Sequence, residues 1–266
     1  MNNFLLLSPL EQFQIRPIFS IKFGIFDFSI TNATVILFLI FVLTLLYIMS
    51  IIDRKETNSK IIYNADNFTI VPSRVEAVFE MVFNMILSLA NDNIKHKENA
   101  KFFPLVFFLF LFITSLNSIG LIPYSFTLTS HIIVTLGMSL AIFIGINIIC
   151  FKKHGIHFFS LFLPPGTSIV LAFLLVPIEL ISYVFKPISL SIRLFANMMA
   201  GHTLLKVIAG FAFTLMNCTG ILFLAHYGPL LILVPLFALE LAVALIQAFV
   251  FSILICIYLN DALNLH

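Results

Sequence analysis

The sequence predicts an all-α, multi-pass membrane protein with about five membrane-crossing helices and one amphipathic surface helix. Of its 266 residues, 61% are hydrophobic and only 10% are charged, and the mean hydropathy is +1.13. A soluble domain usually carries about 25% charged residues to cover its surface. These values exclude a soluble enzyme and a disordered protein. The net charge of +2 also gives no basic face for nucleic acid.

The three cysteines lie far apart along the chain, at Cys150, Cys218 and Cys256. Their odd number and wide spacing predict neither a disulfide framework nor a thiolate metal site. His154 and His157 lie close together, but two histidines with this spacing are a weak metal motif. We therefore expect no metal and no cofactor.

Apolar stretches of at least about 18 residues can cross the bilayer as helices. By this criterion the chain is a single membrane domain with an outer N-terminal segment (1–28), a first span (29–52), a helical hairpin (102–151) and two long helices (167–216 and 229–262). The break within the hairpin falls at Gly120 and Pro123, which favour a tight turn.

The last two stretches are too long for an upright crossing. A helix of about 50 residues would measure about 75 Å, whereas the hydrocarbon core is about 30 Å thick. We therefore expect both helices to be strongly tilted or broken. Pro177, Pro187 and Pro235 can bend them, because proline removes a backbone donor.

Lys and Arg residues concentrate on one side of the predicted spans. Between the first span and the hairpin lie Arg54, Lys55, Lys60, Arg74, Lys95, Lys97 and Lys101, and Lys152 and Lys153 follow the hairpin. The loops at 122–130 and 217–228 hold none. Because Lys and Arg stay on the inner side, we predict five crossings with the N-terminus outside and the C-terminus inside.

One segment on the inner side is predicted to be a helix. Ser73 and Glu76 form a capping box, and apolar residues then recur at helical spacing through 74–92. We expect this amphipathic helix to lie on the inner membrane surface. The alternative is a helix docked on a soluble partner.

The first long helix carries charges that must face protein or water, since a charge in lipid is costly. Glu179, Lys186 and Arg193 are spaced by seven residues, which keeps them on one helix face. Asn197 joins this polar stripe at a spacing of four. His202, nine residues after Arg193, points to the opposite side because residues advance about 100° each.

The last helix shows a similar line of polar residues. Glu240, Gln247 and Tyr258 are separated by seven and eleven residues, which places all three on one face. A carboxylate, an amide and a phenol can each hold water or pass a hydrogen bond. The pattern therefore favours a proton or cation path.

Structural roles stay open for several of these groups. Lys186 and Lys206 can extend from a tilted helix to the lipid headgroups, and Glu179 can be an ion-pair partner of Lys186 or Arg193. We expect His131 and His226, in the outer loops, to be solvated.

The segment SLSIRLFANMMAGH at 189–202 resembles the signature of subunit a of the F-type (F1Fo) ATP synthases. NSIGLIPYSFTLTSH (117–131), HFFSLFLPPG (157–166) and the last helix (239–266) resemble the mitochondrial branch of that family. The resemblance covers most of the chain and is weakest at about 53–73.

The resemblance implies a non-catalytic, proton-translocating stator subunit in the mitochondrial inner membrane. Its expected partners are the c-subunit ring, the peripheral stalk and other Fo subunits, and membrane lipids. Protons would reach a ring carboxylate by one half-channel and leave by another. In this family an essential arginine, matched here by Arg193, separates the two half-channels.

The other site residues are carried over by their match to the family pattern. Asn197 and Gln247 match polar residues beside the arginine. His202 and Glu240 match the pair of the inlet half-channel, in the mitochondrial order that exchanges the bacterial one, and Asn117 is assigned to the same path. Glu179 and Tyr258 match positions nearer the outlet.

Two other classes would also bury charges in a membrane. A secondary cation/proton antiporter usually contains internal repeats, and SIRLFANMMAG has no second copy here. A haem or quinone redox subunit would need facing histidines within the spans, and only His202 lies clearly inside one. Both alternatives are therefore weaker than the stator subunit.

Overall fold

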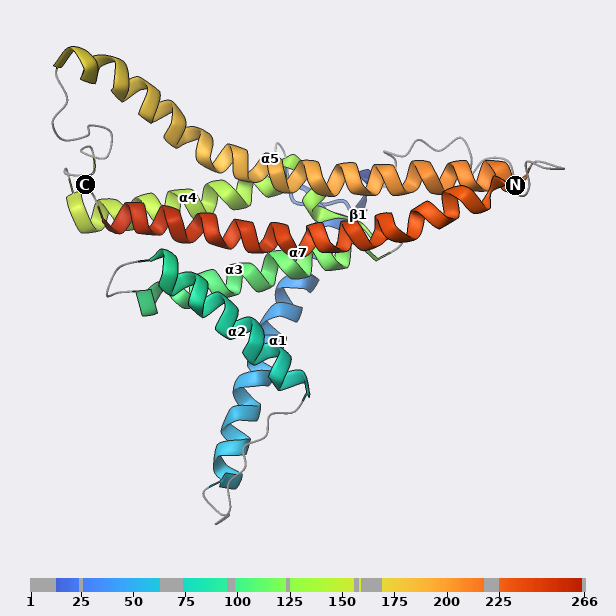
Figure 1. Cartoon of the computed structure of the whole chain (residues 1–266), viewed down its shortest axis with the longest axis horizontal. Helices are drawn as coiled ribbons and strands as arrows, with labels where there is room; N and C mark the ends of the chain where they lie inside the picture. Colours follow the sequence, from blue (N-terminus) through green and yellow to red (C-terminus); the bar gives the residue numbers. More distant parts are fainter. Residues whose placement is uncertain are drawn as a thin grey trace.

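The structure, a computed structural model, describes residues 13–23, 26–62, 74–94, 99–122, 125–155, 158, 169–217 and 225–264. The regular elements in those residues are six α-helices, the 3₁₀ turn η3 and four short strands. Five of these helices are long and apolar enough to cross a membrane, as the sequence predicts. The last two, α5 and α7, lie side by side, with α3 and α4 against them (Figure 1).

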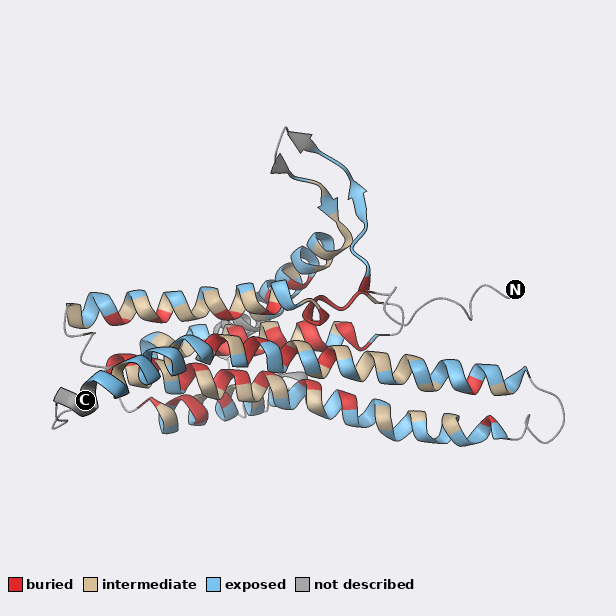
Figure 2. Cartoon of the chain, turned by 90° about the horizontal axis from the view of Figure 1, so that it is seen from above, coloured by how far each residue is buried: buried red, intermediate tan, exposed pale blue. Residues whose placement is uncertain are grey.

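The strands form a ribbon before the first helix. β1 (Pro17–Phe19) pairs antiparallel with β4 (Ile30–Thr31), and β2 (Lys22–Phe23) pairs with β3 (Phe26–Asp27). β1 and β4 stand out from the helical body (Figure 2). These strands are not predicted from the sequence, because strands of two or three residues are too short to show an alternating pattern.

Helix α1 spans Asn32–Ile62, whereas the predicted first span is 29–52. It begins later because the two residues before Asn32 belong to β4. The Asn32 side chain fixes this junction, since its Oδ1 accepts hydrogen bonds from the backbone N–H groups of Arg16 (3.2 Å) and Ala33 (3.0 Å). In Figure 1, α1 leaves the other helices at a steep angle.

The predicted amphipathic helix is α2, Arg74–Asn93. Its buried side chains, among them Ile86 and Leu89, pack on α3 and α7. Val78 and Met81 stay exposed beside them. One part of the apolar face therefore meets the chain's own helices and the other part remains uncovered. Ser73 of the predicted capping box lies outside the described residues.

The predicted hairpin at 102–151 consists of α3 (Asn99–Gly120) and α4 (Ile132–His154), with η3 (Leu128–Ser130) between them. The turn is held by side chains. Ser125 Oγ donates to the carbonyl oxygens of Ile119 (2.6 Å) and Gly120 (3.2 Å), at the helix end where carbonyls lack the usual donor four residues on. The Ile119 carbonyl also accepts from the Ile122 backbone N–H (3.2 Å).

The two long helices are α5 (Ile169–Met216) and α7 (Tyr227–Leu263). The 48 residues of α5 correspond to about 72 Å. This helix is continuous rather than broken, but its first part leaves the line of the remainder (Figure 1). Pro177 and Pro187 lie in that part, and each removes a backbone hydrogen bond, which explains the bend.

Helix α7 is the centre of the core, since it contacts α2, α3, α4 and α5. Its buried residues recur every three or four positions and include Ala244, Ala248, Phe251, Ile255 and Leu259. At its end, the Leu263 carbonyl is within hydrogen-bond distance of Lys153 Nζ (3.3 Å) and His154 Nε2 (3.2 Å) of α4. These contacts fix α7 against the hairpin.

Candidate functional site

Two polar contacts between α5 and α7 define the candidate site. His202 of α5 meets Glu240 of α7 at one end, and Lys186 of α5 meets Asp261 of α7 at the other. The earlier residue of α5 contacts the later residue of α7, so the two helices run antiparallel. All the polar residues predicted for a path on these helices, except Glu179, lie between or at these two contacts.

The contact between His202 and Glu240 is buried. His202 Nδ1 lies 3.6 Å from Glu240 Oε1, and the two side chains are only 14% and 6% exposed. Neither oxygen of Glu240, nor His202 Nε2, has a hydrogen-bond partner among the described residues. Buried polar groups are normally satisfied by protein or water, so this arrangement fits a hydrated site.

Gly201 makes room for the Glu240 side chain. A Cβ atom at position 201 would lie 2.5 Å from Glu240 Oε1 and 2.8 Å from its Cδ. Since the Cβ of α5 is fixed by the backbone, any larger residue would displace the carboxyl group. Sequence reasoning missed this role, although the Gly-His pair stands in the segment that carries the family resemblance.

Asn117 of α3 joins the same region from the side. Its side chain is fully buried, and its Nδ2 donates to the Ala244 carbonyl (3.0 Å), one turn beyond Glu240 on α7. Its Oδ1 has no hydrogen-bond partner among the described residues. The structure thus places Asn117 against α7, one helical turn from Glu240 along that helix.

The second contact lies near the other end of α7. Lys186 Nζ is 3.4 Å from Asp261 Oδ2, and lies 5.1 Å and 5.4 Å from the ring centroids of Tyr258 and Tyr183. A cavity of about 10 Å³ adjoins Tyr258, Lys186 and Asp261, which is room for about one water molecule. Lys186 is therefore held by an acid and two aromatic faces.

Between the two contacts lie the remaining predicted residues. Arg193 is exposed, whereas Asn197 and Gln247 are half-buried. Because the helices are antiparallel, Asn197 lies at about the level of Gln247. Two residues before Arg193 on α5, Ser191 faces α4, since its Oγ lies 3.0 Å from Thr135 Oγ1. Arg193 is thus presented on the outer surface of the helix pair.

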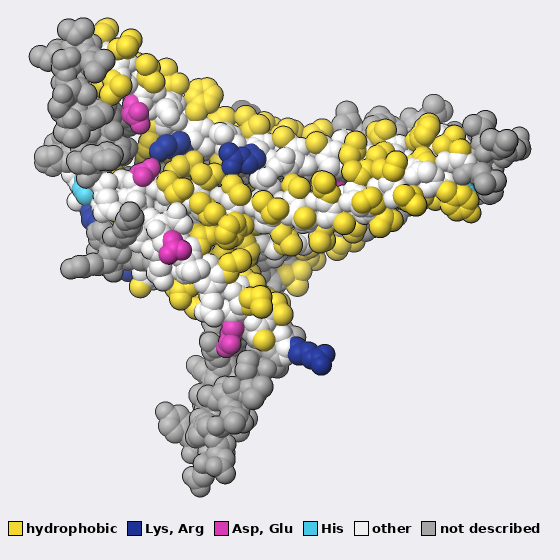
Figure 3. All heavy atoms as spheres, viewed as in Figure 1, with side chains coloured by type: hydrophobic (Ala, Val, Ile, Leu, Met, Phe, Trp, Pro, Cys, Tyr) yellow, Lys and Arg dark blue, Asp and Glu magenta, His cyan; other side chains and the backbone are white. Residues whose placement is uncertain are grey.

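Charged groups on this face are few and unevenly placed. Figure 3 shows Lys, Arg, Asp and Glu side chains toward one end of the α5–α7 pair, while the other end is hydrophobic. Within the described part of the chain, neither Arg193 nor Glu179 has an ion-pair partner. The alternative in which Glu179 pairs with Lys186 is wrong, because Lys186 pairs with Asp261.

The structure also corrects the expectation that His131 and His226 are solvated. His226 is buried, and its ring lies 4.1 Å from that of Tyr227. His131 stacks on Phe126 with ring centroids 5.1 Å apart, and burial lowers the pKa of its imidazole. Both histidines therefore pack against aromatic rings, which a loop sequence does not reveal.

Asp261 is the second residue that sequence reasoning missed. It follows Tyr258 by three positions, a spacing that places both on one helix face. That signal was present in the sequence. The sequence did not reveal the partner of Asp261, because Lys186 belongs to another helix 75 residues earlier.

The fold and this site define a multi-pass membrane protein with ionisable residues buried between two long helices. A family model described as ATP synthase A chain matches residues 34–260. Several proteins named ATP synthase subunit a are similar to this chain along nearly their whole length. That of Pylaiella littoralis is 53% identical, with 97% of this chain and 99% of that protein covered. That of Marchantia polymorpha is 47% identical, with the same coverage.

A third relative, ATP synthase subunit a of Chondrus crispus, is 45% identical, with 99% of each chain covered. The chain belongs to the ATP synthase A chain family. It is therefore a membrane subunit of the ATP synthase that takes part in ATP synthesis and proton transport.

Proposed function

We propose that this chain is the non-catalytic stator subunit that carries protons to and from the c-subunit ring through two half-channels separated by Arg193. It would work in the mitochondrial inner membrane together with the ring, the peripheral stalk and other Fo subunits. The observation that carries the proposal is the opposite placement of two groups on α5. The His202–Glu240 contact lies buried against α7, whereas Arg193 is exposed.

The inlet half-channel would contain His202, Glu240 and Asn117. These side chains come from three helices, and each has a buried polar atom without a hydrogen-bond partner among the described residues. Water molecules that satisfy these atoms would connect the groups. An imidazole and a carboxyl group can then pass a proton in turn, because each can both donate and accept one.

The outlet half-channel would lie at the other end of α5 and α7. Glu179, Tyr258 and Asp261 supply two accessible carboxylates and a phenol there. Lys186 Nζ holds the Asp261 carboxylate in place at 3.4 Å. A proton leaving the ring could move along these groups to the inner solution.

Arg193 would act between the two paths by charge alone. Its guanidinium keeps its proton at every physiological pH, so it cannot relay one. An exposed cation would instead attract a deprotonated carboxylate of the ring and favour proton release. Asn197 and Gln247, at one level beside it, would orient the guanidinium and that carboxylate by hydrogen bonds.

Replacement of Arg193 tests this function. In vesicles that hold the assembled complex, Arg193→Ala should abolish ATP synthesis driven by an imposed proton gradient. Arg193→Lys should fail as well, because it lacks the planar five-donor group. Lys206→Gln, which removes another cation from α5, is the control and should synthesise ATP nearly normally. Coupled synthesis by Arg193→Ala would refute the proposal.

A further inference from the structure

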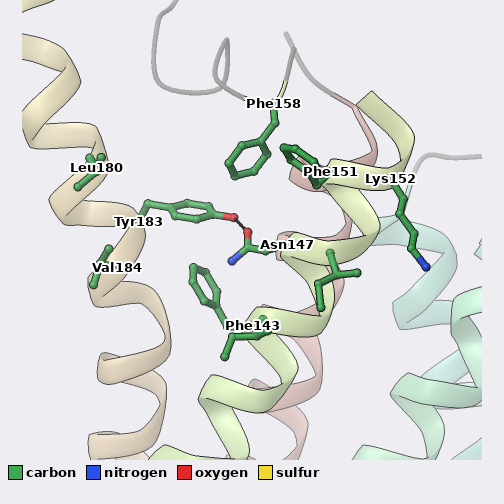
Figure 4. A pocket seen from close by; sticks show the side chains of 10 residues that line it. Phe143, Asn147, Phe151, Lys152, Phe158, Leu180, Tyr183 and Val184 are labelled. Carbon is green, nitrogen blue, oxygen red and sulfur yellow. Dashed lines mark hydrogen bonds between the residues drawn. The ribbon is translucent and has the colours of Figure 1, made fainter. Parts of the chain in front are cut away.

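A groove lies between α4 and the first part of α5, on the side of these helices away from α7. Figure 4 shows it with its lining side chains, and its volume is about 720 Å³. That volume lies within the range of sites for small organic molecules, about 300–1,000 Å³. The bend of α5 contributes to this groove, since it carries the first part of α5 away from the line of the remainder.

The groove wall is apolar, and several of its side chains are exposed. Ile144, Ile148 and Phe151 of α4 are each more than half exposed, and Leu180 and Val184 of α5 are 48% exposed. A patch of large apolar side chains between two membrane helices is solvated by hydrocarbon rather than by water. The chemistry of the wall therefore suits an acyl chain.

Two polar side chains in the groove are hydrogen-bonded to each other. Tyr183 OH donates a hydrogen bond to Asn147 Oδ1 across the space between the two helices (Figure 4). On its other side, the Tyr183 ring lies against Lys186. The groove thus presents a neutral floor, which favours hydrocarbon over an ion or a column of water.

One end of the groove is positively charged. Lys152 lines it, and its ammonium group extends away from the Tyr183–Asn147 pair (Figure 4). Lys153 and His154 follow directly and contact the Leu263 carbonyl. This basic end is the predicted inner side of the membrane. Basic pockets between membrane helices on that side suit anionic lipid headgroups.

We propose that this groove binds an anionic phospholipid of the inner leaflet. One acyl chain lies along Ile144 and Ile148, and the phosphate of the headgroup meets Lys152. The lysine stem then packs on the acyl chain while its charge reaches the headgroup. The hydrogen-bonded Tyr183 and Asn147 side chains form the bottom of the groove beneath the lipid.

The test uses the assembled complex in vesicles of phosphatidylcholine, alone or mixed with phosphatidylglycerol. A trace of phosphatidylglycerol or phosphatidylcholine with a photoreactive group on its acyl chain is added and activated by light. Labelled peptides are then mapped by mass spectrometry. The anionic probe should label 143–152 and 180–184 in preference to the zwitterionic one.

Two variants separate charge from shape. Lys152→Gln should lower labelling of the groove by the anionic probe about fivefold and leave the zwitterionic probe unchanged. Ile148→Trp, which fills the groove, should lower labelling by both. The matched controls are Lys101→Gln and Ile133→Trp, an exposed lysine and an exposed isoleucine outside the groove, and both should label normally.

Equal labelling by the two probes would overturn the proposal, because the basic end of the groove would then not prefer the anionic lipid over the zwitterionic one. So would a photoreactive amino acid at position 148 that cross-links to a neighbouring subunit instead of a lipid. Neither result depends on proton transport, so the lipid site and the proposed function stand or fall separately.

Discussion

The imidazole of His202 and the carboxyl group of Glu240 lie 3.6 Å apart although they belong to different helices. This contact exists because Gly201 leaves the space that the Glu240 side chain fills. A glycine in the middle of a helix costs about 0.5–1 kcal/mol relative to alanine. At position 201 a larger residue would instead have to displace the Glu240 carboxyl group.

Gly201→Ala should therefore impair proton transport without removing any titratable group. The new Cβ atom would press on Glu240 and move its carboxyl group away from His202, and a shift of about 1 Å can lower a rate about 100-fold. ATP-driven proton pumping in vesicles measures the effect. Gly210→Ala on the same helix is the control, since its Cβ would have no atom within 4 Å. Equal pumping by the two variants would show that Gly201 makes no critical space.

The His202–Glu240 pair should be exchangeable. Glu240→Gln keeps the size of the side chain but cannot titrate, so it should slow proton uptake while the complex stays assembled. His202→Glu combined with Glu240→His places the same two groups in contact again and should pump better than either single variant. Passive proton conductance should not rise in any of them, since Arg193 is intact. A double variant no better than the worse single one would remove this pair from the path.

The hairpin turn should loosen in acid. Because burial lowers the pKa of His131 from its ordinary value of 6.5, the folded turn prefers the neutral imidazole. Its contribution to stability is thus full above that value and is lost as the pH falls through the lowered pKa. Hydrogen exchange of residues 125–131, corrected for its intrinsic pH dependence, should accelerate in acid. His131→Phe keeps a ring against Phe126 and should abolish this acceleration; its persistence would assign the effect to another group.

The predicted orientation can be tested by cysteine labelling. Ile122, in the hairpin turn, and Asp92, on α2, are both exposed. In a background with Cys218→Ser, an impermeant maleimide should reach Ile122→Cys only from the outer side and Asp92→Cys only from the inner side. Cys150 and Cys256 are 1% and 0% exposed, so the maleimide should not label them in the Cys218→Ser background protein. The reverse pattern would invert the assignment of the two half-channels.

Periodicity and composition predicted much of this protein without its structure. The five apolar helices follow from hydropathy, because lipid permits few other solutions for a spanning backbone. Arg193, His202 and Glu240 stand out for a related reason, since ionisable residues inside spans are costly and rarely incidental. The opposite directions of Arg193 and His202 follow from the helical repeat alone.

Only the tertiary structure determined which residues these side chains contact. No spacing along the chain could show that Glu240 contacts His202 or that Lys186 pairs with Asp261 and not with Glu179. Nor could it show that Asn117 donates to the Ala244 carbonyl. Helical repeats fix directions within one helix, whereas contacts between helices depend on their relative register and rotation. Those follow from how the side chains of α3, α4, α5 and α7 pack together, which is a property of the whole assembly of helices and not of any one segment.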